Sequence, residues 1–142
     1  MLIVHPILQS AATLLALYVM YLGMARFGSL HLEKTTVFKW KRHVILGYLC
    51  LGTWLVGMAA GATVVYLYWH GILITGTHGT VSLAMVPFMA FGLASGLYME
   101  RKKLKRKALP LMHGVSNLVV LILALTQIVS GWGVYKAFVQ GG

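Results

Sequence analysis

The chain has 142 residues, of which 59% are hydrophobic and only 10% are charged. A soluble domain carries about 25% charged residues, so this composition argues against an ordinary soluble fold. The single cysteine, Cys50, excludes an internal disulfide. The net charge of +10 is high enough to suggest nucleic acid as a partner, but the placement of the charges excludes it, as shown below.

Four apolar stretches are long enough to cross a bilayer, which takes about 20 helical residues. They cover residues 4–26, 43–68, 75–99 and 110–135. Strand-like alternation is absent, and a backbone in lipid must satisfy its own hydrogen bonds, so the spans are expected to be helices. The prediction is one all-α domain, residues 1–142, forming an integral membrane four-helix bundle in up-down-up-down order.

The basic residues predict the orientation of this bundle. Eleven of the twelve lie in or beside the first and third connections, and only Lys136 lies near the C-terminus. This is the positive-inside pattern, so both termini are expected on the non-cytoplasmic side of the membrane. The charges therefore indicate membrane lipid as the partner and no nucleic acid.

Taken in order, the first helix opens with His5-Pro6 and is expected to be retained rather than cleaved as a signal peptide. The first connection contains His31 and Glu33, and the second helix follows a basic cluster with His43. An aromatic turn holding His70 precedes the third helix. The third and fourth helices carry His78 and His113 near their starts, and the fourth begins at Pro110.

A repeat links these helices. His5, His43, His78 and His113 are 38, 35 and 35 residues apart, and a glycine stands 18 residues after each: Gly23, Gly61, Gly96 and Gly131. Eighteen residues are five helical turns, so each glycine shares its histidine's face about 27 Å further along. The second and third helices add a glycine at offset fourteen, Gly57 and Gly92.

Alternate spans run in opposite directions, which places His5 and His78 at one depth and His43 and His113 at the other. Two histidines at one depth can supply both axial nitrogens of a haem iron. The sequence therefore predicts two non-covalent b-type haems with irons on the order of 20 Å apart. No C-x-x-C-H sequence occurs, so c-type attachment is excluded. The six glycines would let each macrocycle approach the backbone.

Other interpretations remain open at this point. A lone histidine in a membrane helix often only bonds to a neighbouring helix, and Gly-x-x-x-Gly often only packs helices. A metal or proton transport bundle is the non-redox alternative, although the only acids are Glu33 and Glu100. A histidine that binds a metal through one ring nitrogen usually has a hydrogen-bond partner on the other. Such partners are expected among Gln9, Ser82 and Asn117, each one turn from a candidate ligand.

The pattern resembles the dihaem core of transmembrane cytochromes of the b-561 type. His5-Pro6, R-H-x3-G at 42–47, and H-G at 78–79 and 113–114 are similar to that family's helix starts, in a minimal four-helix, bacterial-type form. The resemblance implies electron transfer across the membrane, with His5/His78 and His43/His113 as ligand pairs. A quinol, a small reductant or a redox protein would be the partner, with homo-oligomers allowed. A haem- and quinone-binding anchor subunit of a larger oxidoreductase is the alternative.

Overall fold

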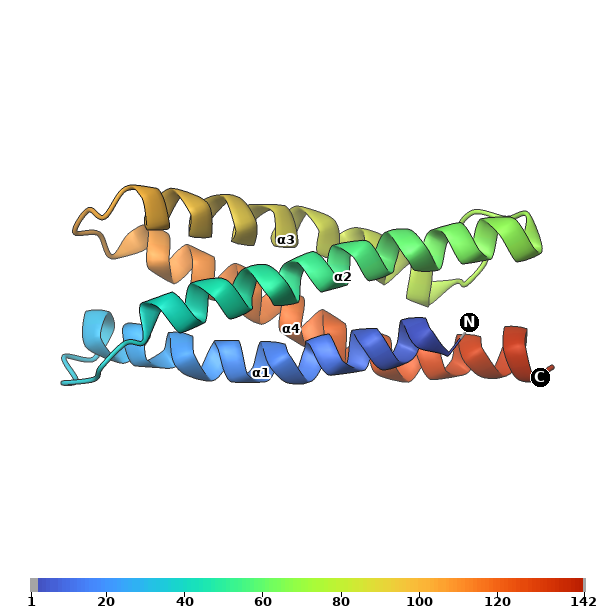
Figure 1. Cartoon of the computed structure of the whole chain (residues 1–142), viewed down its shortest axis with the longest axis horizontal. Coiled ribbons are helices and arrows are strands. Elements are labelled where there is room, and N and C mark those ends of the chain that lie inside the picture. The colour runs from blue at the N-terminus through green and yellow to red at the C-terminus, as the bar shows by residue number, and fades with distance from the viewer. Residues whose placement is uncertain (1–2, 142) are drawn as a thin grey trace.

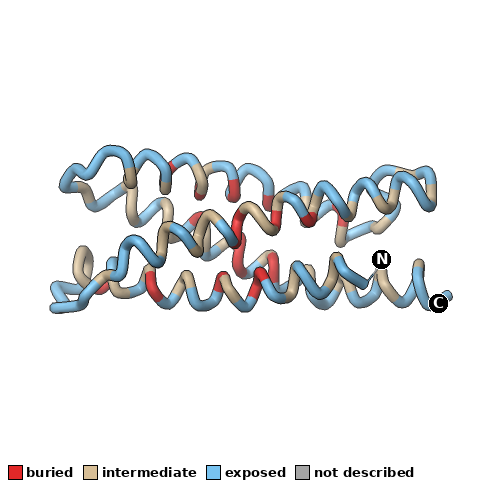
Figure 2. The backbone as a smooth tube through the Cα atoms, in the orientation of Figure 1, coloured by how far each residue is buried: buried red, intermediate tan, exposed pale blue. Residues whose placement is uncertain are grey.

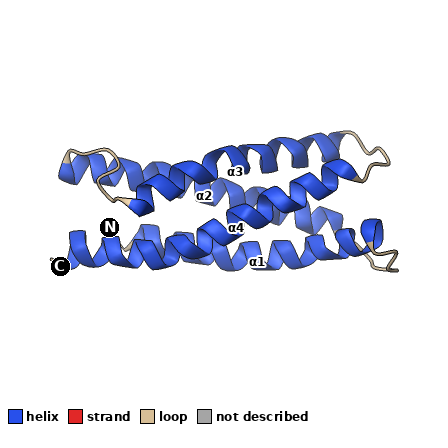
Figure 3. Ribbon diagram, turned by 180° about the vertical axis from the view of Figure 1, so that it is seen from behind, coloured by secondary structure: helices blue, strands red, loops and turns tan. Residues whose placement is uncertain are grey.

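The computed structural model describes residues 3–141, and within this range the chain is helical and contains no strand. The helices are α1 (Val4–His31), α2 (Trp40–Trp69), α3 (Thr77–Arg101) and α4 (Ala108–Tyr135), and a π-helical turn, η1 (Lys136–Gln140), extends α4. Figure 3 shows that only short loops join them. The all-α class and the four long helices confirm that part of the prediction.

Helices α1, α2 and α4 are longer than the apolar stretches that predicted them, and α3 has the same length but begins and ends two residues later. Hydropathy marks the lipid-facing part of a helix and does not define its ends. The largest difference is in α1, which ends at His31 instead of residue 26. His31 was expected in the connection, but it is the last residue of α1 and its ring lies 5.1 Å from that of Phe27. The connection folds back on this extension, where Thr36 donates a 2.6 Å hydrogen bond to the carbonyl of Ala25.

The four helices form a ring in which α1 packs against α2 and α4, and α3 packs against the same two neighbours. Helices α1 and α3 therefore lie diagonally across the bundle, as do α2 and α4. Figure 1 shows both ends of the chain beside the α2–α3 connection, at what we call the terminal end. The other two connections lie at the opposite end, which we call the basic end because residues 32–39 and 102–107 carry most of the lysines and arginines.

Most of the buried residues lie in the middle part of the bundle, as Figure 2 shows, and a few, such as Gly28 and Gly79, lie nearer its ends. Met89 and Val120 are fully buried in the middle part, with Trp54 and Cys50 close to that limit. Most other apolar side chains face outward, and each of the four helices is long and apolar enough to cross a membrane. An apolar exterior around a small core is the organisation of an integral membrane protein, because lipid solvates that exterior.

The bundle is built from two hairpins, α1–α2 and α3–α4. Among residues 3–141, the interhelical side-chain hydrogen bonds fall within these hairpins with one exception. That exception is Tyr48 of α2, whose hydroxyl donates to Glu100 of α3 at 2.7 Å. Apart from this bond, packing is what holds the hairpins together.

Candidate functional site

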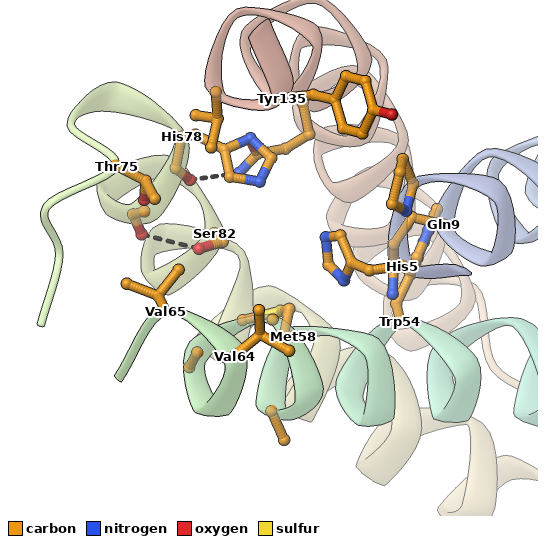
Figure 4. Close-up of a pocket in the computed structure, with 18 of the residues that line it drawn as sticks. His5, Gln9, Trp54, Met58, Val64, Val65, Thr75, His78, Ser82 and Tyr135 are labelled. Atoms are coloured by element: carbon orange, nitrogen blue, oxygen red, sulfur yellow. Dashed lines mark hydrogen bonds between the residues drawn. The ribbon is translucent and has the colours of Figure 1, made fainter. Parts of the chain in front are cut away.

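The four predicted histidines meet in two pairs, and the members of each pair come from diagonal helices. His5 of α1 and His78 of α3 lie at the terminal end with ring centroids 6.5 Å apart. His43 of α2 and His113 of α4 lie at the basic end with centroids 6.3 Å apart. Each hairpin therefore contributes one histidine to each pair. Figure 4 shows His5 and His78 projecting into one open space from opposite sides.

The centroid distances match two imidazoles that bind one metal from opposite sides. A metal–imidazole nitrogen bond is about 2.0 Å long, and a ring nitrogen lies about 1.1 Å from the ring centre for ring bonds of about 1.35 Å. The centroids of two such ligands are therefore about 6.2 Å apart. A direct ring-to-ring hydrogen bond would bring them to about 5.1 Å; the observed 6.5 and 6.3 Å are longer than this, and they also fit an edge-to-face contact between the two rings.

In each of the four paired histidines the Nδ1 atom has a hydrogen-bond partner on the other helix of its own hairpin. For the first hairpin these partners are backbone carbonyls: Nδ1 of His5 lies 3.0 Å from the oxygen of Gly57, and Nδ1 of His43 lies 3.1 Å from that of Val19. A carbonyl only accepts, so both Nδ1 atoms must carry the proton. Their Nε2 atoms then keep a lone pair for a metal.

For the second hairpin the partners are serine hydroxyls. Nδ1 of His113 lies 2.8 Å from Oγ of Ser95, and Nδ1 of His78 lies 3.1 Å from Oγ of Ser130. Ser95 donates its own proton to the carbonyl of Phe91 at 2.6 Å, so its oxygen is left to accept from Nδ1. Ser130 likewise donates its proton, to the side-chain oxygen of Gln127 at 3.0 Å, so its oxygen can accept from Nδ1 of His78. The network assigns the same tautomer to all four histidines.

The glycines that follow each histidine by 18 residues make room for the histidine of the neighbouring helix. A Cβ atom at Gly61 would lie 2.9 Å from Cε1 of His5, and one at Gly131 would lie 3.0 Å from Cε1 of His78. The corresponding distances are 3.2 Å between Gly23 and His43, and 3.5 Å between Gly96 and His113. The sequence assigned these glycines to a macrocycle, whereas their nearest neighbours are the imidazole rings of the four histidines.

The two additional glycines face polar side chains one turn beyond a histidine. Gly57 packs against the amide of Gln9, and a Cβ atom at Gly92 would lie 2.8 Å from Oδ1 of Asn117. Gln9 makes no hydrogen bond to the predicted histidine ring, whereas Asn117 does lie against the ring of His113, with its side-chain nitrogen 3.5 Å from Nδ1. Gln9 donates to the carbonyl of Thr53 at 3.4 Å, and Asn117 donates to the carbonyl of its own His113 at 2.8 Å, with its nitrogen 3.4 Å from Nε2 of that ring.

Ser82, the third predicted partner, also makes a different bond, because its hydroxyl donates to the carbonyl of Gly79 at 2.8 Å. The residues that do accept from the histidines, Ser95 and Ser130, were missed. A signal for them exists in the sequence, because each serine directly precedes its repeat glycine, in S-G at 95–96 and 130–131. In the first hairpin the acceptors are backbone atoms, which leave no such signal.

A cavity of about 1380 Å³ surrounds the pair at the terminal end. His5 and His78 line it together with Trp54, Met58 and Tyr135, and Figure 4 shows these side chains around the open space. Cofactor sites usually measure about 300–1,000 Å³ and are mostly apolar. The cavity is therefore large enough for a macrocycle between the two imidazoles.

The composition of the site favours a cofactor that brings most of its own metal ligands. Within residues 3–141, no group of three or more His, Cys, Asp or Glu side chains lies close enough to hold a metal ion. A zinc site needs three or four protein ligands, whereas a porphyrin supplies four nitrogens and requires two axial ones. Neither His70, which is exposed at the terminal end, nor His31 belongs to a pair.

No protein-family model, no curated protein and no solved structure significantly matches this chain. The resemblance to the b-561 type accordingly stays a prediction from short motifs. What can be said about function depends on the paired histidines and their surroundings.

Proposed function

We propose that the chain is a membrane cytochrome that holds two b-type haems and transfers electrons between them across the bilayer. The observation that carries the proposal is the spacing of the two diagonal histidine pairs, 6.5 and 6.3 Å between centroids. Two further features support it: every Nδ1 atom is occupied, and glycines clear the space beside the ligand rings. Each bound haem would supply an iron that cycles between two oxidation states.

The residues of the chain have separate tasks in this proposal. The four histidines present Nε2 to the irons, and the acceptors on Nδ1 fix their tautomer and raise their basicity. The core between the pairs, which includes Trp54 and Met89, keeps water out of the space between the two sites. The pairs are separated by the 18 residues from His43 to Gly61, or about 27 Å along α2.

The orientation follows from charge. We infer an up-down-up-down bundle with the basic end in the cytoplasm and both termini on the outer side of a bacterial inner membrane. His43 and His113 would then hold the inner haem, and His5 and His78 the outer one. Electrons would enter from a quinol or reductant at one haem and leave to an acceptor at the other.

A second candidate is a haem- and quinone-binding anchor subunit of a larger oxidoreductase. The cavity at the terminal end favours it, because about 1380 Å³ exceeds the usual range for one cofactor. Mild-detergent purification would separate the two functions. A stand-alone cytochrome is expected to elute without a stoichiometric partner, and an anchor would bring a soluble redox subunit with it.

The direct test is the haem content of the purified protein. Chain made in haem-replete cells is expected to be red, to show a sharpened visible band on reduction, and to release about two non-covalent haems. His43→Ala and His113→Ala should each remove the same haem and spare the other, whereas His70→Ala, at an exposed position, should remove none. A colourless protein would refute the proposed function, and loss of the same haem from His43→Ala and His5→Ala would refute the proposed pairing.

A further inference from the structure

A second functional surface lies at the basic end, where α2 meets α3. The ring of Trp40, the first residue of α2, is covered by the ammonium group of Lys103, whose Nζ lies 4.1 Å from the ring centroid. The Nζ atom of Lys41 lies 5.9 Å from the same centroid. Cations from two chain segments about 60 residues apart therefore meet at one aromatic ring that is itself 37% exposed.

Beside this ring a second exposed aromatic side chain gathers two more cations. The guanidinium of Arg106 lies 4.8 Å from the ring centroid of Tyr98, and Nζ of Lys102 lies 5.6 Å from it. The third connection therefore turns several of its cations back onto the helix ends instead of extending all of them into solvent. We call Trp40, Lys41, Tyr98, Lys102, Lys103 and Arg106 the cationic–aromatic patch.

The acids of the chain neutralise only a small part of the charge around this patch. The chain has twelve lysines and arginines but only two acids, Glu33 and Glu100. Glu33 is an exposed residue of the first connection, and Glu100, which accepts from Tyr48, faces six cations in residues 101–107. Such an excess of positive charge attracts an anion from outside the chain.

Below the patch, the helices present apolar side chains at the depth where lipid tails lie. On α2, Ile45 and Leu49 follow Lys41 at intervals of one turn and are 61% and 56% exposed. This row runs beside the row of Trp40 and Tyr48, of which Tyr48 contacts α3. Leu97 on α3, one turn from Glu100, is 39% exposed. Cations above an apolar row match the two ends of a phospholipid.

We propose that the α2–α3 seam at the basic end binds an anionic phospholipid, with its phosphate between Lys41 and Lys103. Its acyl chains would follow Ile45, Leu49 and Leu97. Basic residues at a membrane surface attract anionic headgroups, each contributing roughly a fivefold preference. The positive-inside rule requires only an excess of basic residues on one side of the membrane, whereas the proposed site depends on Lys41 and Lys103 in particular. The proposal is independent of haem.

The test compares spin-labelled phosphatidylglycerol with spin-labelled phosphatidylcholine on the full chain reconstituted in phosphatidylcholine vesicles. The motionally restricted fraction of each label gives the relative affinity. The expected preference for phosphatidylglycerol is about fivefold or more, and 1 M salt should reduce it. Lys41→Gln with Lys103→Gln should reduce it to nearly one. The matched control, Lys34→Gln with Lys39→Gln, changes the net charge equally in the first connection and should retain it.

Two outcomes would overturn the proposal. An equal decrease in both double variants would show that the preference follows net charge and that no local site exists. No preference in the unmodified chain would leave an acidic protein as the partner of the patch. If the first double variant does not fold, Trp40→Phe keeps both lysines and should weaken, but not abolish, the preference, because a phenyl ring holds a cation less strongly than an indole ring.

Discussion

The closest approach between a glycine and a histidine ring leads to a graded prediction for glycine-to-alanine substitutions. In Gly61→Ala the new Cβ atom would lie 2.9 Å from Cε1 of His5 and 3.2 Å from its Nδ1. The optimal van der Waals separation of two carbon atoms is about 3.5–4.0 Å, so the His5 ring must move by about 0.6 Å or more. Gly96→Ala is the matched control, because its Cβ atom would lie 3.5 Å from Cε1 of His113, an ordinary contact.

The displacement has two costs for the pair at the terminal end. Overpacking of this kind costs about 1–3 kcal/mol. The 3.0 Å bond from His5 to the carbonyl of Gly57 is stretched beyond the hydrogen-bond limit, which costs about 1 kcal/mol more. Together these weaken haem binding at that site by about 30- to 1,000-fold. Gly96→Ala should change the affinity of the other site by less than about threefold.

The assay is titration of haem into the apoprotein, with haem per chain measured after excess haem is removed. Unmodified chain and Gly96→Ala should retain two haems after the excess is removed, and Gly61→Ala should retain one. Gly131→Ala approaches His78 at 3.0 Å and should lose the same haem as Gly61→Ala. The reasoning fails if Gly61→Ala and Gly96→Ala bind haem equally, or if Gly61→Ala and Gly131→Ala lose different haems.

Three more predictions address the hydrogen bonds and the hairpins. Ser95→Ala should weaken binding of the haem at the basic end by about 10- to 100-fold, and Ser130→Ala should do the same to the haem at the terminal end. Haem titration followed at the separate visible bands measures both affinities, and weaker binding of the opposite haem in either variant would contradict the assignment. Tyr48→Phe should lower the unfolding free energy of the apoprotein by about 1.5–3 kcal/mol through loss of the bond to Glu100, and an unchanged denaturation midpoint in detergent would contradict this. Removing both haems should increase hydrogen exchange where the hairpins meet more than within either hairpin; a uniform increase would count against haem as the link between them.

Much of this arrangement could be predicted from the sequence, because hydropathy locates each membrane helix and the regular rise of a helix sets the depth of each residue. The spans follow from hydropathy, and the pairing of His5 with His78 follows from their equal depth on alternate helices. The structure brings these two rings together as expected, and likewise His43 and His113. Residues that share a helical face can be placed by counting turns alone.

The contacts between helices were not readable in the same way. Counting turns places Gly61 on the face of His43, but it does not say that His5 of the adjacent helix fills the space beside it. The rotation of each helix about its own axis depends on packing against neighbours, which no periodicity in one helix specifies. Gln9 and Ser82 were therefore assigned to histidines that they do not contact through their polar atoms, while two backbone carbonyls and two serines have that role.

The division into hairpins explains why the site is placed diagonally. Within a hairpin, the histidine of each helix packs against a glycine of the other helix, so that His5 contacts Gly61 and His43 contacts Gly23. These contacts position each ring within its own hairpin and hold Nδ1 against an acceptor there, which leaves Nε2 free of that acceptor. Between the hairpins, one polar side-chain bond was found in the described part of the chain, from Tyr48 to Glu100. A group held by one histidine from each hairpin would therefore stabilise the whole bundle as well as carry electrons, because ligand binding adds its free energy to that of the folded state alone.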